Sequence, residues 1–247
     1  MNGLFAALAL LVVTGSALAE ALAPDTLIRQ ITDDVIASLR HDSAIRAGDS
    51  ARIAALVETK IVPHFDFRRI TRMAVGPAWR HATPEQQDQL TRQFKRLLVR
   101  TYSGALSSYS DQTIEVRPLR AEPQDDEVTV KSFFRQSGAG PMAIEYDLER
   151  TDAGWKVFEV RVAGVSLVAT YRTAFAEEIR NHGVDGLIAV LVRKNNDRAV
   201  TPARIRSEAY GGVDLMSQGS HERLFIDRAR FGEWVHLKLQ SHIGDLP

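Results

Sequence analysis

The stretch EVTVKSFFRQSGAGPMAIEYDLERTDAGWKVFEVRV, residues 127–162, decides the fold of this 247-residue chain. Apolar residues recur at every second position in its three segments, which are separated by turn sequences at 138–141 and 152–154. A period of two is typical of strands with one buried face. A shorter alternation begins near residue 112, so we predict an antiparallel sheet of about four strands with one apolar face.

Helical patterns precede the predicted strands. Apolar residues repeat every three to four positions behind Pro24, and Asp49 is placed to cap a second helix. The sequence TPEQ at 83–86 forms a capping box with proline at the first helical position. The helix that begins there is expected to run to about Ser107.

Helical patterns also follow the predicted strands, over residues 168–182 and 185–193, with Gly183 between them. Helices, then a run of strands, then helices again indicate an α+β fold. We expect the helices to pack on a curled sheet and to form a cone-shaped apolar cavity, as in NTF2-like and cystatin-like folds. Such a cavity can hold a ligand.

The N-terminus has the pattern of a secretory signal peptide. Residues 4–13, LFAALALLVV, form an apolar run of ten residues, whereas a spanning helix needs roughly 20. Ala17-Leu18-Ala19 is a small-x-small cleavage signal, so we predict a signal peptide at 1–19 and export to the periplasm. The remaining chain is expected to hold a domain at 20–195 and a C-terminal extension at 196–247, to which we assign no role.

Composition excludes several classes of function. Lys plus Arg and Asp plus Glu both total 31, so no net charge favours nucleic-acid binding. The chain has no cysteine, which excludes disulfides, thiolate catalysis and cysteine zinc sites. No GxxxxGK[ST] or GxGxxG motif is present, and we expect no cofactor.

The polar motifs of the chain do not indicate a catalytic or metal site. His64 and Asp66 supply too few ligands for a closed zinc site. The sequence around Ser166 lacks the second glycine of the GxSxG nucleophile motif. We therefore predict no metal site and no catalytic residues.

Several short runs of the chain resemble the MlaC family, also called toluene-tolerance proteins, across about residues 25–195. In the family's order they are FDF (65–67), MAVG (73–76), WRHATPEQ (79–86), FKRLL (94–98), WKVFEV (155–160), GVSL (164–167) and YR (171–172). Two positions depart from the family pattern: Phe158 stands in place of a tyrosine and Thr170 in place of an asparagine.

The resemblance implies a periplasmic phospholipid-binding shuttle that is not an enzyme and that maintains outer-membrane lipid asymmetry. Its implied partners are a phospholipid ligand, an outer-membrane lipoprotein complex, and an inner-membrane ABC transporter complex with an MCE-domain subunit. Two alternatives stay open at this point. One is a carrier of a hopanoid-like lipid, and the other is a small-molecule isomerase or hydratase on a cone-shaped fold. A structural or adaptor protein with a filled cavity is a third possibility.

We expect the acyl chains to lie between sheet and helices, against large apolar and aromatic residues. The expected lipid-binding residues are Trp79, Phe94, Leu98, Tyr102, Phe133, Tyr146, Phe158, Val165, Leu167 and Tyr171. A basic helix face is either a solvated surface or a docking patch for an acidic partner or for lipid headgroups. Its residues are Arg92, Lys95, Arg96 and Arg100.

Overall fold

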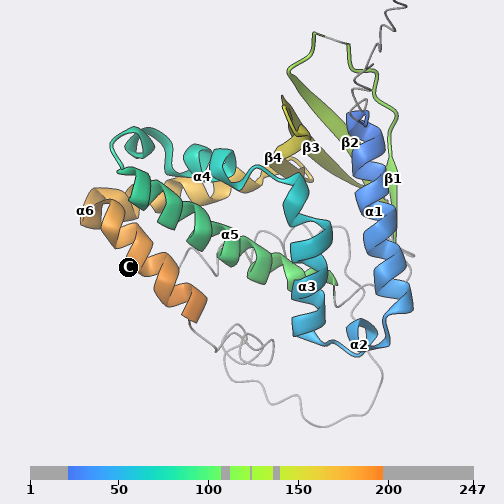
Figure 1. Ribbon diagram of the computed structural model, residues 1–247, viewed down its shortest axis with the longest axis horizontal. Coiled ribbons are helices and arrows are strands. Elements are labelled where there is room, and N and C mark those ends of the chain that lie inside the picture. The colour runs from blue at the N-terminus through green and yellow to red at the C-terminus, as the bar shows by residue number, and fades with distance from the viewer. Residues whose placement is uncertain (1–21, 107–111, 123, 136–139, 197–247) are drawn as a thin grey trace, which may run out of the picture.

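The computed structural model describes residues 22–106, 112–122, 124–135 and 140–196. Helices pack on an open antiparallel sheet, which confirms the predicted α+β class (Figure 1). The expected signal peptide, the first part of the turn at 138–141 and the C-terminal extension from residue 197 onward lie outside the described residues. No described helix is both long enough and apolar enough to cross a membrane.

The N-terminal helices form a hairpin. The elements are α1 (Pro24–His41), α2 (Ser43–Arg46), α3 (Ser50–Lys60) and the 3-10 turn η1 (Val62–His64). Asp49 caps α3 as predicted, because its carboxylate accepts hydrogen bonds from the backbone N–H groups of Ala51 and Arg52. Asp42 caps the short α2 in the same way.

The central helices begin where a backbone contact ties the chain to the sheet. The backbone N–H of Asp66 donates to the carbonyl of Val157, just before α4 (Phe67–Val75). The 3-10 turn η2 (Gly76–Arg80) leads to α5 (Pro84–Leu106). The predicted capping box is confirmed, since Thr83 and Gln86 each accept a hydrogen bond from the other's backbone N–H.

The sheet has five strands in sequence order, one more than the predicted number of about four. They are β1 (Thr113–Val116), β2 (Glu127–Arg135), β3 (Met142–Thr151), β4 (Gly154–Val162) and β5 (Val165–Ser166). All pairings are antiparallel. The additional strand is only two residues long, too short to produce an alternating pattern in the sequence.

A bulge in β4 changes which side chains face the helices. Asp147 of β3 pairs with Glu159 and Leu148 pairs with Val157, which leaves Phe158 as an extra residue. Val157 and Val160 therefore face the same side of the sheet, although they are three positions apart. Strict alternation, on which the prediction of strand faces depends, fails at this point.

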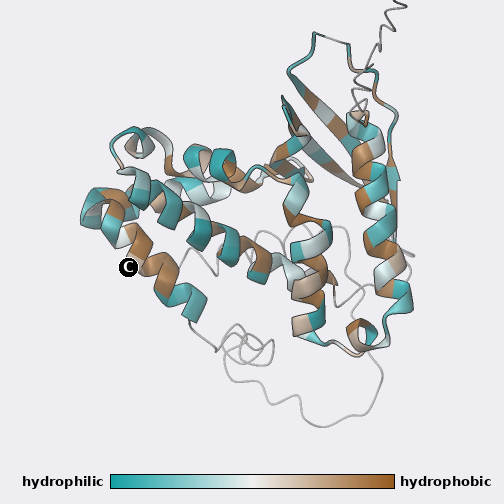
Figure 2. Cartoon of the chain, viewed as in Figure 1, coloured by the Kyte–Doolittle hydropathy of each residue, from teal (hydrophilic) through white to brown (hydrophobic). Residues whose placement is uncertain are grey.

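The C-terminal helix α6 (Leu167–Asn196) is bent at Gly183, where the backbone has φ 69° and ψ −175°. This positive φ favours glycine and interrupts the helix. The two predicted helical segments on either side of Gly183 are thus confirmed. Polar and apolar residues alternate along the helices and strands (Figure 2). Buried apolar residues of α6 pack with those of α5 in one cluster.

The buried apolar residues of the described part of the chain form three clusters. The first joins α4, α5 and α6 around Phe94, Tyr171 and Phe175. The second joins α1 to the inner face of the sheet, and the third joins α1 to α2 and α3. Partly buried residues, including Ile31 and Phe65, connect the clusters.

Candidate functional site

An apolar cavity of about 410 Å³ lies between the helices and the inner face of the sheet. This volume is within the range of roughly 300–1,000 Å³ that is usual for small-molecule sites. None of the described residues that line it is charged. They are Ile28, Ile31, Thr32, Val35, Ile36, Leu39, Val57, Ile61, Val62, Phe65, Phe67, Ile70, Leu98, Val99, Tyr102, Ser103, Leu106, Gln112, Ile114, Phe134, Tyr146, Val160, Val162, Val165 and Leu167.

The cavity lies where the three core clusters meet. Many lining side chains are the partly buried members at the edge of a cluster, such as Ile31, Phe65, Tyr146 and Val165. A fully packed core would cover these side chains with other side chains. Here they border open space, so the fold leaves a large apolar surface available to a ligand.

The hydroxyl groups in the cavity wall add little polarity. Thr32 and Ser103 donate to the carbonyls of Ile28 and Val99, within their own helices, at 2.8 and 2.6 Å. Burial raises the pKa of Tyr102, and the nearby Tyr171 raises it further, so the Tyr102 phenol stays neutral. An apolar chain thus fits this wall better than a charged group does.

Half of the expected lipid-binding residues line this cavity. Leu98 and Tyr102 contribute from α5, Tyr146 from β3, Val165 from β5 and Leu167 from the start of α6. They come from four separate elements, which the fold brings together around one space. Whether they bind lipid stays a prediction.

Four other candidates lie in the packed core and do not line the cavity. Phe94 is fully buried, and its ring makes edge contacts with Tyr171 and Phe175 at centroid distances of 4.9 and 5.0 Å. Trp79 is buried in the same cluster. A role of these residues in lipid binding stays a prediction. The sequence could not separate them from cavity residues, because burial in helix packing and burial against a ligand give the same apolar pattern.

Phe158 is the fourth of these core residues, and the bulge in β4 explains its position. Its side chain packs with the cluster of α4, α5 and α6. The guanidinium of Arg69 lies 3.5 Å from the centre of the Phe158 ring and pairs with Glu127 and Glu149. Phe158 therefore helps to join α4 to the sheet.

Phe133, the remaining expected lipid-binding residue, lies on the outer face of the sheet and does not line the cavity. Its neighbour Phe134 lines the cavity instead. The guanidinium of Arg117 lies 5.2 Å from the centre of the Phe133 ring. Adjacent strand residues point to opposite faces, so choosing the wrong member of a Phe-Phe pair inverts the assignment.

Helix α1 forms a large part of the cavity wall, although none of its residues is among the expected lipid-binding residues. Six of its residues, spaced along one face, line the cavity: Ile28, Ile31, Thr32, Val35, Ile36 and Leu39. The helical period of the segment revealed its apolar face. It did not show that this face borders a cavity, since a core helix has the same period.

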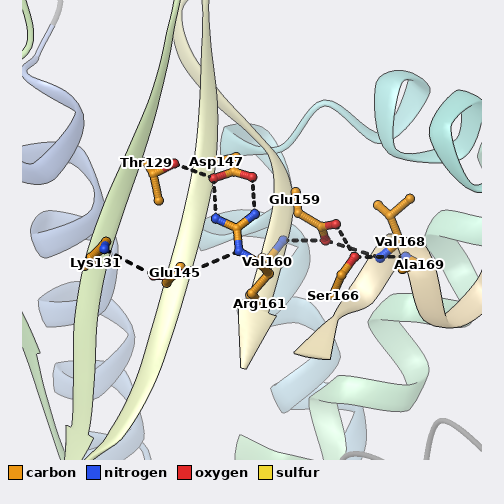
Figure 3. A network of polar contacts seen from close by, with 10 residues as sticks. All are labelled: Thr129, Lys131, Glu145, Asp147, Glu159, Val160, Arg161, Ser166, Val168 and Ala169. Atoms are coloured by element: carbon orange, nitrogen blue, oxygen red, sulfur yellow. Dashed lines mark hydrogen bonds and ion pairs between the residues drawn. The ribbon is translucent and has the colours of Figure 1, made fainter. Parts of the chain in front are cut away.

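Glu159 connects β4, β5 and α6 through hydrogen bonds (Figure 3). Its buried carboxylate accepts hydrogen bonds from the backbone N–H groups of Val160 and Val168 and from the hydroxyl of Ser166. Ser166 thus has a structural partner. Val165 and Leu167, which flank Ser166 in the sequence, line the cavity.

A second polar group in Figure 3 covers the outer face of the sheet. Arg161 donates to Glu145 and Asp147, and Lys131 pairs with Glu145. The hydrogen bond from Arg161 holds the pKa of Glu145 below its usual value. These charged side chains lie on the face of the sheet opposite Tyr146 and Val160, which line the cavity.

The expected docking residues lie along α5. Arg92, Arg96 and Arg100 are exposed, whereas Lys95 forms an ion pair of 3.1 Å with Glu58 of α3. Within the described residues, no group of three histidine and acidic side chains is arranged to hold a metal ion.

Comparisons with known proteins agree on one family. The family model described as "MlaC protein" matches residues 29–193. A solved structure of a phospholipid-binding protein from Ralstonia solanacearum, in complex with a phospholipid, is similar with a TM-score of 0.66 and 37% sequence identity. The similarity covers 75% of this chain and 100% of that chain.

Two curated proteins are also similar in sequence. The intermembrane phospholipid transport system binding protein MlaC of Haemophilus influenzae is 21% identical over 71% of this chain and 83% of its own length. The toluene tolerance protein ttg2D of Pseudomonas putida is 32% identical over 43% of this chain and 49% of its own length.

Proposed function

Because the chain belongs to the MlaC family, we propose that it is a non-enzymatic periplasmic carrier of phospholipid. In this proposal it moves lipid between an outer-membrane lipoprotein complex and an inner-membrane ABC transporter complex with an MCE-domain subunit. This exchange maintains the lipid asymmetry of the outer membrane. The protein reaches the periplasm through the predicted signal peptide at 1–19.

The uncharged cavity is the observation that carries the proposal. Its described lining is almost entirely aliphatic and aromatic and includes no charged residue. Catalysis requires polar groups that act on a reacting atom. The lining hydroxyls of Thr32 and Ser103 are instead bonded to their own helices.

Energetics make a carrier of this kind workable without a nucleotide. Burying roughly 30 lipid methylenes at about 0.8 kcal/mol each contributes on the order of 24 kcal/mol relative to water. A bilayer offers the chains a similar environment, so exchange between bilayer and cavity is close to balanced. The free-energy barrier to transfer comes from exposing the acyl chains to water. Docking to a membrane complex removes this barrier, because the chains then pass directly between the cavity and the complex.

Transfer between two membranes tests this function. Purified protein is incubated with donor vesicles that contain labelled phospholipid and with acceptor vesicles that carry the transporter complex. We expect the protein to become loaded and to deliver label to acceptors that hold the complex. Equal delivery to acceptors without the complex would contradict the partner assignment.

Docking through the basic face of α5 gives a separate prediction. Arg96→Glu is expected to slow delivery to transporter vesicles about fivefold, since a rim charge acts chiefly on association. The lipid content of the protein should not change, because Arg96 is exposed and does not line the cavity. The rate of delivery and the bound lipid are measured on the same samples.

The matched control is Arg180→Glu on α6, which makes the same charge change at another exposed site. It should leave delivery at the rate of the unmodified protein. Equal slowing by both variants would show a general effect of net charge and would remove the docking role from α5.

A further inference from the structure

The cavity lies between two apolar units of the fold. One is the cluster of α4, α5 and α6, and the other is the cluster of α1 and the sheet. Ile70 and Leu98 line the cavity from the first unit, and Tyr146 and Val160 line it from the second. The shape of the cavity therefore depends on how α4 is held relative to the sheet, beside which it lies at β4 (Figure 1).

Arg69 of α4 contacts three strands of the sheet. Its guanidinium donates to Glu149 of β3 at 2.5 Å and to Glu127 of β2 at 2.6 Å. Glu127 and Glu149 are directly paired across these two strands. The same guanidinium lies 3.5 Å from the centre of the Phe158 ring in β4. A single side chain thus connects α4 to β2, β3 and β4.

The contacts of Arg69 are shielded from solvent. The side chain of Arg69 is 16% exposed and that of Glu149 is 20% exposed, whereas Arg68 and its partner Asp88 of α5 are both more than half exposed. Burial raises the pKa of Glu149, although the hydrogen bond from Arg69 opposes this shift. Removing one partner of a shielded pair leaves the other charge without compensation, so these contacts are harder to lose than those of an exposed pair.

The first turn of α4 carries both the contacts to the sheet and part of the cavity wall. Phe67 and Ile70 line the cavity, and Arg69 lies between them in the sequence. Asp66 caps this turn by accepting a hydrogen bond from the backbone N–H of Arg69, and its own N–H donates to the carbonyl of Val157 in β4. A displacement of this turn from the sheet would therefore move Phe67 and Ile70 as well.

We propose that Arg69 is a positioning residue for lipid retention. It holds the first turn of α4 on the sheet and so keeps Phe67 and Ile70 against the acyl chains, although Arg69 itself does not line the cavity. This inference rests on the proposed carrier function. When the contacts of Arg69 are lost, this turn is free to move away from the sheet, and bound lipid leaves faster.

Arg161 offers a matched control, because it makes the same kind of contacts within the sheet. Its guanidinium donates to Glu145 and Asp147 of β3, and its side chain is 27% exposed. Arg161→Met and Arg69→Met each remove two ion pairs and keep a long apolar side chain. Only Arg69→Met removes contacts between α4 and the sheet.

The test measures the spontaneous release of lipid. The protein is loaded with phosphatidylglycerol that carries a fluorescent acyl chain and is mixed with an excess of unlabelled vesicles that lack any transporter complex. Arg69→Met is expected to release the lipid about tenfold faster than the unmodified protein, since two hydrogen bonds between charged groups are lost. Arg161→Met should release it at the unmodified rate.

Two further measurements separate positioning from stability. Urea denaturation gives the free energy of unfolding of both variants, and we expect a similar loss in each because each loses two ion pairs. Arg69→Lys keeps the charge but loses the forked contact and the ring stacking, so its release should be about threefold faster than that of the unmodified protein. Equal acceleration of release by Arg69→Met and Arg161→Met would assign the effect to stability and overturn the positioning role.

Glu149→Gln keeps the proposal testable if Arg69→Met does not fold or holds no lipid. This near-isosteric change removes one ion pair of Arg69, and release should become about threefold faster. Its control is Glu145→Gln, which removes one ion pair of Arg161 and should leave release unchanged. Unchanged release in Glu149→Gln and in a folded, lipid-bearing Arg69→Met protein would overturn the positioning role and leave the carrier function in place. Failure of the unmodified protein to take up lipid would overturn both.

Discussion

Val165→Arg is expected to abolish the co-purification of phospholipid while the protein still folds. Val165 lines the cavity from the short strand β5, beside Val162 of β4. A guanidinium in this space has no described carboxylate on the cavity wall to pair with, and an unpaired charge in apolar surroundings costs several kcal/mol. Because each 1.4 kcal/mol is a factor of ten, bound lipid should fall by at least about tenfold.

Ala143→Arg is the matched control for this variant. Ala143 is exposed on the outer face of the same sheet, next to Phe133 in the adjacent strand. Circular dichroism should give the same helix and strand content for both variants, and organic extraction should recover lipid from Ala143→Arg only. Retention of lipid in a folded Val165→Arg protein would contradict the position of the ligand.

Phe94→Ala is expected to have the largest effect on stability. The Phe94 side chain is fully buried between α5 and α6, and its ring contacts Tyr171 and Phe175. Truncation of a buried phenylalanine to alanine costs about 3–5 kcal/mol. Urea denaturation should show this loss in the free energy of unfolding. The folded fraction should still bind lipid, because Phe94 does not line the cavity.

Phe94→Leu keeps the experiment informative if the alanine variant does not fold. A volume-conserving apolar exchange usually costs less than about 1.5 kcal/mol. We expect wild-type lipid content in the leucine variant. Loss of lipid with unchanged stability would show that Phe94 contacts the ligand, as the sequence pattern first indicated.

Much of the fold could be predicted from local signals. The capping box at Thr83 and Gln86, the cap at Asp49 and the break at Gly183 are each set by a few neighbouring residues, and the structure has all of them. The antiparallel pairing was predictable because few residues separate β2, β3 and β4 along the sequence. The short β5 could not be predicted, since its two residues give no alternation.

The cavity could be predicted only in part. An apolar residue that packs in a core cannot be told by its hydropathy from one that lines a cavity. The sequence therefore offered no reason to separate Phe94 from Tyr102, although Phe94 packs in the core and Tyr102 lines the cavity. The bulge at Phe158 further disrupts alternation. Only the three-dimensional arrangement shows that α1 forms a wall and that Phe133 faces outward.

Native mass spectrometry of the full chain purified from a bacterial periplasm tests the central claim most directly. The bound species is extracted into organic solvent and identified. The account predicts one phospholipid for each protein molecule, held by two acyl chains. A polycyclic lipid would keep the carrier class but contradict the cargo. Protein that is empty and also takes up no lipid from vesicles would contradict the carrier function itself.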